Sequence, residues 1–281
     1  MNVLLIGSSG FLGGRIKEYF REYFNVIIYE NIKSKKKIDN IDIVISAVGP
    51  NQSYCLKYPK KSISQRIAIN QKVLKKINIE KLKYYFYLST IHVYKKTKII
   101  RENTKLNTDD PYGNSHIETE KYLLKYFSKS RKIVILRLSN CFGVPKNKNS
   151  KAWKLVLHEL CKKIKKNKTI KIKSKENFNR DFLSIKYFLK VLHFLIIRKV
   201  NYRVINISSE NTLSILEVSN IIKKIFEKKF YKKIKILHKI KNYPKKNLIL
   251  SKKIPNKIKI KSSFFFKEEI KDLIGYCHKY F

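Results

Sequence analysis

The first thirty residues alternate between continuous hydrophobic runs and helical spacing of apolar residues. Residues 2–6 form a short apolar run, which is typical of a strand buried on both faces of a parallel sheet. Residues 11–24 carry apolar side chains at helical spacing, on one side of the predicted helix. Residues 26–29 are again apolar, and residues 25–29 predict a second buried strand. The pattern predicts a strand–helix–strand unit, and therefore an α/β fold with a doubly wound parallel sheet.

The pattern changes after Pro145, where short strands alternate with amphipathic helices. Residues 152–166 predict an amphipathic helix, and Ser214 with Glu217 have the spacing of a capping box at the start of another. Further short elements are predicted at residues 169–173, 186–198, 203–207 and 216–228, and a last helix at residues 264–276. We therefore expect the chain to divide into residues 1–145 and residues 146–281.

Glycine is rare in this chain and is concentrated between the first strand and the first helix. Four of the eight glycines lie between residues 7 and 14. Gly7 and Gly10 would let the backbone turn tightly and approach a pyrophosphate, and Gly13 would let the helix pack closely on the sheet. The N-terminus of the helix would offer its N–H groups to the phosphates. The turn therefore predicts a dinucleotide-binding site.

An acidic residue at the end of the second strand completes this predicted site. Glu30 stands where a carboxylate accepts hydrogen bonds from a ribose 2′-hydroxyl and repels a 2′-phosphate. This position favours NAD over NADP as the cofactor. Four lysines that follow closely weaken the preference and leave NADP open: Lys33, Lys35, Lys36 and Lys37.

The glycine turn reads G-x-x-G-x-x-G, and with later motifs it resembles the extended short-chain dehydrogenase/reductase family, the NAD-dependent epimerases and dehydratases of sugar nucleotides. Residues 42–49 are similar to the fourth strand and the turn after it, and residues 84–94 to the strand that ends in the catalytic Ser/Thr. Residues 111–116 resemble the Tyr-x-x-x-Lys segment, residues 136–145 the R-x-x-N-x-x-G-x-P segment, and residues 180–185 the R-D-[FY]-[IL]-x-V segment. The resemblance covers nearly the whole chain and implies a Rossmann-like fold.

The resemblance also implies two functional parts and a set of cofactor contacts. Residues 1–145 would form the dinucleotide-binding domain, and residues 146–281 a substrate-binding part interleaved with the last strands of the sheet. The expected function is that of an NAD(P)-dependent oxidoreductase or epimerase acting on a nucleotide sugar, by 4-keto reduction or C4 epimerisation in surface-polysaccharide biosynthesis. The expected cofactor-binding residues are Gly7, Ser9, Gly10, Phe11, Leu12, Gly13, Glu30, Ala47, Val48 and Asn70.

The expected catalytic residues are Thr90, Tyr112 and His116. Thr90 would hydrogen-bond the substrate oxygen and Tyr112 would act as acid/base, although the pKa of a free tyrosine is about 10 and a nearby cation must lower it. His116 stands one helical turn after Tyr112, where the family has lysine. A histidine is mostly neutral at pH 7 but can still hydrogen-bond the nicotinamide ribose. Two interpretations stay open: His116 works in place of lysine, in a protein tuned to ketone reduction, or the chain binds ligands without turnover.

Three further residues are expected at the substrate. Asn140 and Arg180 fall at positions that, by the resemblance, meet the diphosphate of a nucleotide sugar, and an ion pair with Asp181 is the alternative for Arg180. Directly after the catalytic threonine, the 4,6-dehydratases of the family carry Asp-Glu. Here Ile91 and His92 stand there, so dehydratase chemistry is not expected. His92 is interpreted either as a second proton donor or as a residue that points away from the site.

The charge of the chain adds a hypothesis from another class of function. The formal net charge is +44, and basic side chains interleaved with aromatic ones are densest at residues 228–246. Lysines are spread over the whole sequence, however, which favours a bias of composition over a nucleic-acid surface, and part of this run alternates like a half-exposed strand. The alternative function is a non-catalytic nucleotide-binding member of the same fold that holds RNA or another acidic partner.

The remaining features exclude several classes of protein. The four cysteines lie far apart without a C-x-x-C pair, so no disulfide framework, zinc site or other metal site is predicted. No apolar stretch is long enough to span a membrane, and residues 1–6 are too few for a signal peptide. We expect a cytoplasmic protein without a membrane partner, and the resemblance implies a homodimer.

Overall fold

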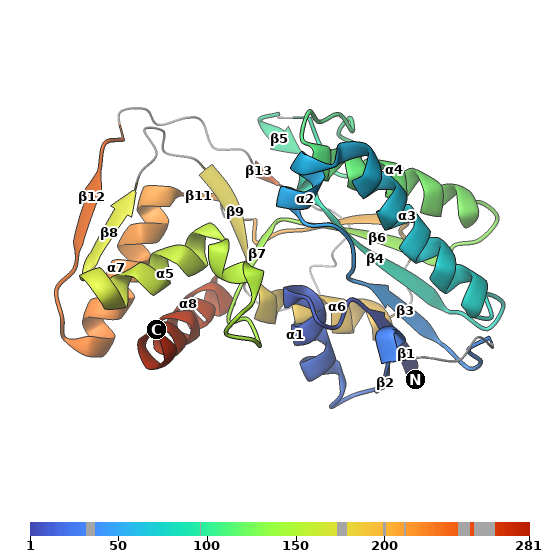
Figure 1. The fold of residues 1–281 in the computed structure, drawn as a ribbon, viewed down its shortest axis with the longest axis horizontal. Coiled ribbons are helices and arrows are strands. Elements are labelled where there is room, and N and C mark those ends of the chain that lie inside the picture. The colour runs from blue at the N-terminus through green and yellow to red at the C-terminus, as the bar shows by residue number, and fades with distance from the viewer. Residues whose placement is uncertain are drawn as a thin grey trace.

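Six parallel strands form the central sheet of the computed structural model, which describes residues 1–31, 37–95, 97–172, 179–198, 201–210, 212–240, 248–249 and 262–281 (Figure 1). In spatial order the strands are β10 (Val204–Ile207), β6 (Ile133–Leu138), β4 (Tyr84–Thr90), β3 (Ile43–Ser46), β1 (Asn2–Ile6) and β2 (Asn25–Ile28). Every neighbouring pair is parallel, so the carboxyl ends of all six strands meet at one edge of the sheet.

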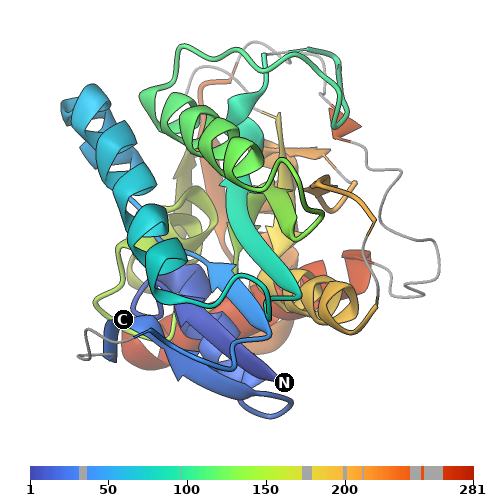
Figure 2. The ribbon, with the colours of Figure 1, turned by 90° about the vertical axis from the view of Figure 1, so that its right-hand side faces the viewer.

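Helices cover both faces of this sheet (Figures 1 and 2). One face carries α1 (Phe11–Phe20) and α6 (Ile185–Ile197), and the other carries α3 (Pro59–Lys76) and α4 (Pro111–Tyr126), with α2 (Gln52–Lys57) beside them. In β1, Val3 and Leu5 enter the first of these two cores, and Leu4 and Ile6 enter the second. The arrangement confirms the predicted α/β fold with a doubly wound parallel sheet.

A second group of elements, built mostly from the later half of the chain, has its own hydrophobic core. The helices α5 (Val156–Asn167), α7 (Ile215–Phe230) and α8 (Ser262–Tyr280) pack around the parallel pair β8 (Thr169–Ile172) and β12 (Lys235–His238). Beside them, β11 (Thr212–Ser214), β9 (Asn179–Ser184) and β7 (Asn140–Phe142) form a small sheet, and β5 (Ile99–Ile100) pairs with β13 (Leu248–Ile249). From this later half, α6 and β10 return to the central sheet (Figure 1).

The predicted helix at residues 152–166 begins later than expected. A short 3-10 turn, η3 (Lys151–Lys154), comes first, because Ser150 Oγ accepts a hydrogen bond from Ala152 N at 3.2 Å and starts a separate turn. Leu155 is extended, and α5 begins at Val156. The start predicted from hydrophobic spacing was therefore wrong by four residues.

The predicted capping box at the start of α7 is confirmed. Ser214 Oγ accepts a hydrogen bond from Glu217 N at 3.1 Å, and the Glu217 carboxylate accepts one from Ser214 N at 2.6 Å. Within the basic run at residues 228–246, β12 is the predicted strand, and residues 241–246 lie outside the described part. No helix in the described ranges combines the length and apolar character needed to cross a membrane.

Candidate active site

The residues predicted to carry chemistry gather at the carboxyl edge of the central sheet. Gly7 follows β1, Glu30 lies in the 3-10 turn η1 (Tyr29–Asn31) after β2, and Thr90 ends β4. In open parallel sheets, ligands bind outside this edge at the point where the strand order reverses. Here the order reverses between β1 and β3, directly beside the glycine turn.

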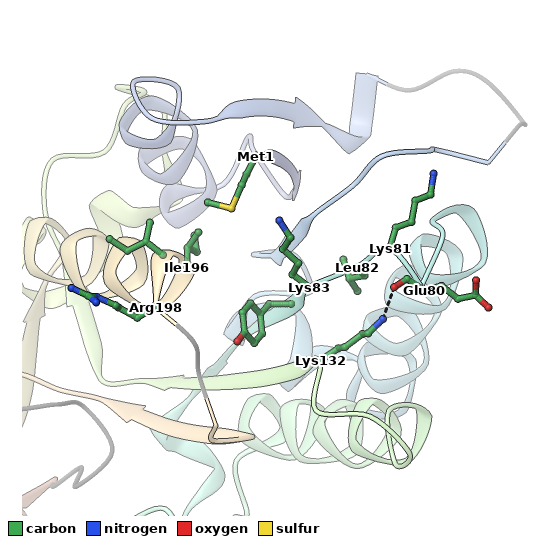
Figure 3. A pocket seen from close by; sticks show the side chains of 10 residues that line it. Met1, Glu80, Lys81, Leu82, Lys83, Lys132, Ile196 and Arg198 are labelled. Carbon is green, nitrogen blue, oxygen red and sulfur yellow. Dashed lines mark hydrogen bonds between the residues drawn. The ribbon is translucent and has the colours of Figure 1, made fainter.

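A pocket of about 650 Å³ opens at the opposite, amino edge of the sheet (Figure 3). Its lining includes Met1, Tyr84 and Lys132, which stand at the starts of β1, β4 and β6. Lys132 Nζ donates hydrogen bonds to the carbonyl oxygens of Ile79 and Glu80 at 2.7 and 2.8 Å. This pocket is therefore separate from the predicted site, and Lys132 has a structural role in joining two loops.

The turn between β1 and α1 has a backbone that excludes side chains. Gly7 has a φ of 87°, and a Cβ on it would lie 2.5 Å from the Ala47 carbonyl oxygen. A Cβ on Gly13 would lie 2.0 Å from the Gly7 carbonyl oxygen, so α1 packs directly against the turn. Gly10 is the N-cap of α1 and has no side chain over the first N–H groups, while Ser9 beside it is exposed. The turn is thus an open cradle of backbone N–H groups.

Glu30 lies against this glycine turn. One of its carboxylate oxygens accepts a hydrogen bond from Gly7 N, and the other lies 3.5 Å from Ser8 Oγ. The carboxylate is therefore placed beside the cradle, as a contact to a ribose next to the pyrophosphate requires. Of the lysines that weaken the preference for NAD, Lys37 is exposed, and the other three (Lys33, Lys35 and Lys36) lie outside the described residues.

Four half-buried apolar residues flank the cradle. Phe11 and Leu12 form the first turn of α1, and Ala47 and Val48 follow the end of β3. Phe11, Leu12 and Ala47 pack on the core under α1 and α6, whereas Val48 packs on the core of the opposite face. The structure therefore brings all four residues to the same turn, and their contact with a cofactor stays a prediction.

Asn70 is fully buried behind the cradle, on α3. Its Oδ1 accepts hydrogen bonds from Ser46 Oγ at 2.9 Å and from Tyr85 Oη at 2.6 Å, and its Nδ2 donates to the Arg66 carbonyl at 2.8 Å. These bonds join α3 to β3 and β4. The observed role of Asn70 is to hold the elements that carry the site, and a direct contact with the cofactor stays a prediction.

Tyr112 occupies the first turn of α4. Asp110 caps this helix by accepting a hydrogen bond from Tyr112 N at 3.1 Å, and Pro111 fills the first helical position. A Cβ on Gly113 would lie 2.3 Å from the His92 carbonyl oxygen, so the helix start packs on the segment that follows β4. This contact positions Tyr112 relative to the end of that strand.

Thr90 ends β4 and is 7% exposed. It is the N-cap of the 3-10 turn η2 (Ile91–Val93), and its Oγ1 accepts a hydrogen bond from His92 N at 3.2 Å. That bond fixes the oxygen and leaves the hydroxyl hydrogen to turn toward a substrate oxygen. The predicted serine or threonine position is therefore held at the carboxyl edge, next to the start of α4.

His116 is buried, with 3% of its surface exposed. Its Nδ1 lies 2.9 Å from Tyr87 Oη, and its Nε2 is buried without a hydrogen-bond partner among the described residues. Burial lowers the pKa of His116 well below its usual value, and the positive charge of Arg66 acts in the same direction. His116 is therefore neutral at pH 7, and one ring nitrogen is left for a ligand. The ring meets Tyr112 edge-on, with 4.8 Å between centroids.

Arg66 is a residue of the site that the sequence motifs did not predict. It lies on α3, is 3% exposed, and its Cζ is 5.5 Å from the centroid of the Tyr112 ring. Burial raises the pKa of Tyr112, and the charge of Arg66 opposes that rise. One signal was present in the sequence: nine of the 64 basic residues are arginine, so arginine in this lysine-rich chain is the exception.

His92 faces Tyr112, and not away from it. The two rings meet edge-on at 6.0 Å between centroids, and His92 Nδ1 lies 3.3 Å from Asp110 Oδ2. Desolvation lowers the pKa of His92 and Arg180 adds to this, while Asp110 opposes it. His92 therefore lies beside the Tyr112 ring, and a role for His92 with the substrate stays a prediction.

The side chains of Arg180 and Asp181 point to opposite faces of β9. Asp181 is 2% exposed and accepts hydrogen bonds from Ser139 Oγ at 2.5 Å and from Ser209 N at 2.9 Å, whereas Arg180 is exposed. Neighbouring residues of a strand point to opposite faces, which does not favour an ion pair between these two side chains. Asn140 is half-buried in β7, and its Nδ2 donates to the Asp181 carbonyl at 3.0 Å.

Solved structures of nucleotide-sugar enzymes share this fold. One is a UDP-N-acetylglucosamine 4-epimerase from Methanobrevibacter ruminantium M1, in complex with UDP-N-acetylmuramic acid. It has a TM-score of 0.79 and 20% identity, over 98% of this chain and 97% of that one. Another is a UDP-glucuronic acid 4-epimerase from Bacillus cereus, in complex with UDP-glucuronic acid and NAD. It has a TM-score of 0.74 and 19% identity, with full coverage of both chains.

The sequence itself also matches known proteins. It is 23% identical over 260 residues to an ADP-L-glycero-D-manno-heptose-6-epimerase from Brachyspira hyodysenteriae (strain ATCC 49526 / WA1), which covers 80% of this chain and 81% of the relative. Residues 3–208 match the model of the NAD dependent epimerase/dehydratase family. The match spans the glycine turn, the Tyr112 segment and the last strand of the sheet, and it confirms the resemblance given by the motifs. The chain belongs to this family of NAD-dependent enzymes.

Proposed function

We propose that this chain moves a hydride between NAD and C4 of a nucleotide sugar, by 4-keto reduction or by C4 epimerisation, in surface-polysaccharide biosynthesis. The observation that carries the proposal is the placement of Tyr112 at the start of α4, packed on the segment that follows Thr90 at the carboxyl edge of the sheet. The similar proteins named above are epimerases of nucleotide sugars, which supports this substrate class.

The residues around the glycine turn fit a dinucleotide. A Cβ on Gly7 or Gly13 would collide with the backbone carbonyl of Ala47 or Gly7, so the tight turn requires glycine at both positions, and the buried His116 Nε2 has no partner among the described residues. The backbone of the turn would hold the pyrophosphate, Glu30 the adenosine ribose, and His116 the nicotinamide ribose. When bound, NAD supplies the hydride acceptor or donor. The carboxylate of Glu30 favours NAD over NADP.

The side chains of this chain would move and hold the proton of the substrate oxygen. In the oxidative direction Tyr112 takes the hydroxyl proton, and in the reductive direction the neutral phenol gives it back. Thr90, with its oxygen fixed by His92 N, would hydrogen-bond the same substrate oxygen. Because burial raises the pKa of Tyr112, the phenol keeps its proton at neutral pH, which is the state that ketone reduction needs.

The phosphates of the substrate would lie toward β9. Arg180 is exposed there, and its positive charge lowers the pKa of His92, so the guanidinium acts on the same side of the molecule as the rings of the site. A guanidinium binds phosphate through two parallel hydrogen bonds, which suits the diphosphate of a nucleotide sugar. We therefore assign the substrate diphosphate to Arg180, with Asn140 close by on β7.

The test is the variant Tyr112→Phe, assayed by NADH oxidation with 4-keto nucleotide sugars and by epimerisation of the matching 4-hydroxy sugars. We expect turnover to fall by at least about 10²-fold, because a positioned acid/base contributes on that order. The affinity for NADH, measured by calorimetry, should not change. Turnover of Tyr112→Phe at the wild-type rate would contradict the proposal.

The matched control is Tyr126→Phe, which removes a hydroxyl from an exposed position of the same helix. It should keep both turnover and NADH affinity. If the wild-type chain binds NADH but turns over none of the sugars, the alternative of a non-catalytic member of the fold would replace this proposal.

A further inference from the structure

A buried cation without a carboxylate partner lies beside the candidate acid/base. Arg66 is 3% exposed, and within the described ranges no aspartate or glutamate forms an ion pair with it. Its guanidinium instead donates to the Pro50 carbonyl at 2.6 Å, the Val48 carbonyl at 3.5 Å and Ser115 Oγ at 3.1 Å. A buried charge without a counterion destabilises a fold. The presence of such a charge therefore points to a use near this position.

The guanidinium is held in one place against the start of α4. A Cβ on Gly49 would lie 2.2 Å from Arg66 Nη1, so the loop after β3 makes room for the guanidinium through a glycine. Ser115 Oγ, which accepts from Arg66 Nε, donates in turn to the Tyr112 carbonyl at 2.8 Å. Arg66 is thereby tied to the same helical turn as the Tyr112 ring, 5.5 Å away.

The other groups that face Tyr112 do not provide a positive charge. On α4, His116 has a lowered pKa, and Asp110 at the N-cap of this helix is acidic; on η2, His92 also has a lowered pKa. Cys55 on α2 and Asp110 both raise the pKa of Tyr112, and the Tyr87 phenol on β4 is neutral, with its own pKa raised by burial. Arg66 is the positive charge that acts on the Tyr112 phenol in the described structure.

We propose that Arg66 is a positioning residue that stabilises the phenolate of Tyr112, while His116 contributes a neutral hydrogen bond through Nε2. Arg66 on α3 would thus supply the fixed positive charge, and His116 on α4 would supply the contact to the cofactor ribose. In the reductive direction, the proton leaves Tyr112 Oη for the substrate oxygen, and the guanidinium stabilises the negative charge left on the ring. This inference rests on the acid/base role proposed for Tyr112.

The test measures the ionisation of Tyr112 directly and needs no substrate. A fluorinated tyrosine at position 112 reports ionisation through its ¹⁹F chemical shift, in wild type and in Arg66→Met, Arg66→Gln and Arg66→Lys. The apparent pKa should rise by about one unit in the Met and Gln variants, because a cation at this distance lowers the pKa of an acid by that order. Arg66→Lys should restore most of the wild-type value, since it keeps the charge.

The matched control is Arg203→Met, which removes another arginine that donates to backbone carbonyls of the α4 segment, those of Leu124 and Phe127. This variant should leave the ionisation of Tyr112 unchanged, even where it lowers the melting temperature. Two uncharged variants of Arg66 are used so that a folded one is at hand, and Gln retains a donor for the Pro50 carbonyl. An unchanged pKa in either folded variant overturns the proposal.

Turnover separates this inference from the proposed function. If the pKa of Tyr112 rises in Arg66→Met but Tyr112→Phe retains turnover, then Arg66 stabilises the phenolate and the acid/base assignment is wrong. If Tyr112→Phe is inactive but the pKa does not depend on Arg66, then the acid/base assignment holds and the present inference fails. If the wild type is active, the pKa of the basic limb of its pH–rate profile should rise in Arg66→Met by the same amount as the pKa measured by ¹⁹F.

Discussion

His158, a buried histidine outside the candidate site, connects the stability of this fold to pH. His158 has no exposed surface, its Nε2 lies 2.6 Å from the Gly143 carbonyl oxygen, and its ring meets Phe11 and Trp153 edge-on. Burial lowers the pKa of His158 to about 4. An unfolded histidine has a pKa of about 6.5, so between these values the unfolded chain binds the additional proton. The contribution of His158 to stability is therefore fully present above the pKa of the unfolded histidine. It is lost as the pH falls toward the pKa of His158 in the folded chain.

The prediction is a smaller pH dependence in His158→Gln. Between pH 6 and pH 5, the unfolding free energy of the wild type should fall by about 1.2 kcal/mol more than that of the variant. Urea unfolding at both pH values measures this difference. Because the other histidines are present in both proteins, their contributions cancel. Equal losses in the two proteins would show that His158 titrates normally in the folded chain.

Some residues of the candidate site can be predicted from their spacing in the sequence, and others cannot. Tyr112 and His116 are one turn apart on a helix, and the glycines of the turn lie within eight residues, so their spacing along the chain already places them together. Arg66 is different, because its contacts to Pro50, Ser115 and Tyr112 join three elements that meet through the fold. No spacing along the chain records such a contact. The hydrogen bonds of the buried Asn70 side chain could not be predicted from the sequence for the same reason, since they join α3 to β3 and β4.

At the scale of elements, the contact between α1 and the glycine turn gives a sharp test of packing. Gly13→Ala would bring a Cβ within 2.0 Å of the Gly7 carbonyl oxygen, a backbone atom that cannot turn aside. We expect a loss of unfolding free energy of about 2 kcal/mol or more, since overpacking at a fixed contact costs about 1–3 kcal/mol or above. Chemical denaturation without ligands measures this loss.

Gly14→Ala is the matched control, on the next residue of the same helix. Its Cβ would be 3.5 Å from the Ser8 carbonyl oxygen, an ordinary van der Waals contact. Alanine is the better helix former, so this variant should keep or raise stability, by up to about 1 kcal/mol. Equal destabilisation by both substitutions would mean that α1 does not pack on the turn as described.

The boundaries of elements were predictable where a side chain marks them. Ser214 with Glu217 carries capping chemistry that is local in sequence, and α7 begins where it predicts. The start of α5 lies four residues beyond the predicted one, because the apolar spacing continues through the 3-10 turn that Ser150 caps. The spacing of hydrophobic residues alone locates a helix but does not locate its first residue.

For the molecule as a whole, the fold class followed from the strand–helix–strand pattern, whereas the meaning of the charge did not. The net charge of +44 is a sum over the chain and has no position. In the structure, exposed lysines occur on elements of both halves, such as Lys57 on α2, Lys121 on α4 and Lys235 on β12. The described surface therefore favours a dispersed positive field over one footprint, and such a field attracts any polyanion.

The two functional hypotheses differ in how binding responds to salt. A dispersed field holds RNA through counterion release, so an RNA that contacts several lysines should lose about 10³-fold or more in affinity between 50 and 200 mM salt. NADH presents few charges and would be held by backbone N–H groups of the glycine turn and by Glu30, so its affinity should fall far less over the same range. Fluorescence titrations of both ligands at four salt concentrations measure the two slopes. RNA binding that falls steeply with salt, together with no measurable NADH binding, would favour the non-catalytic alternative over the proposed function.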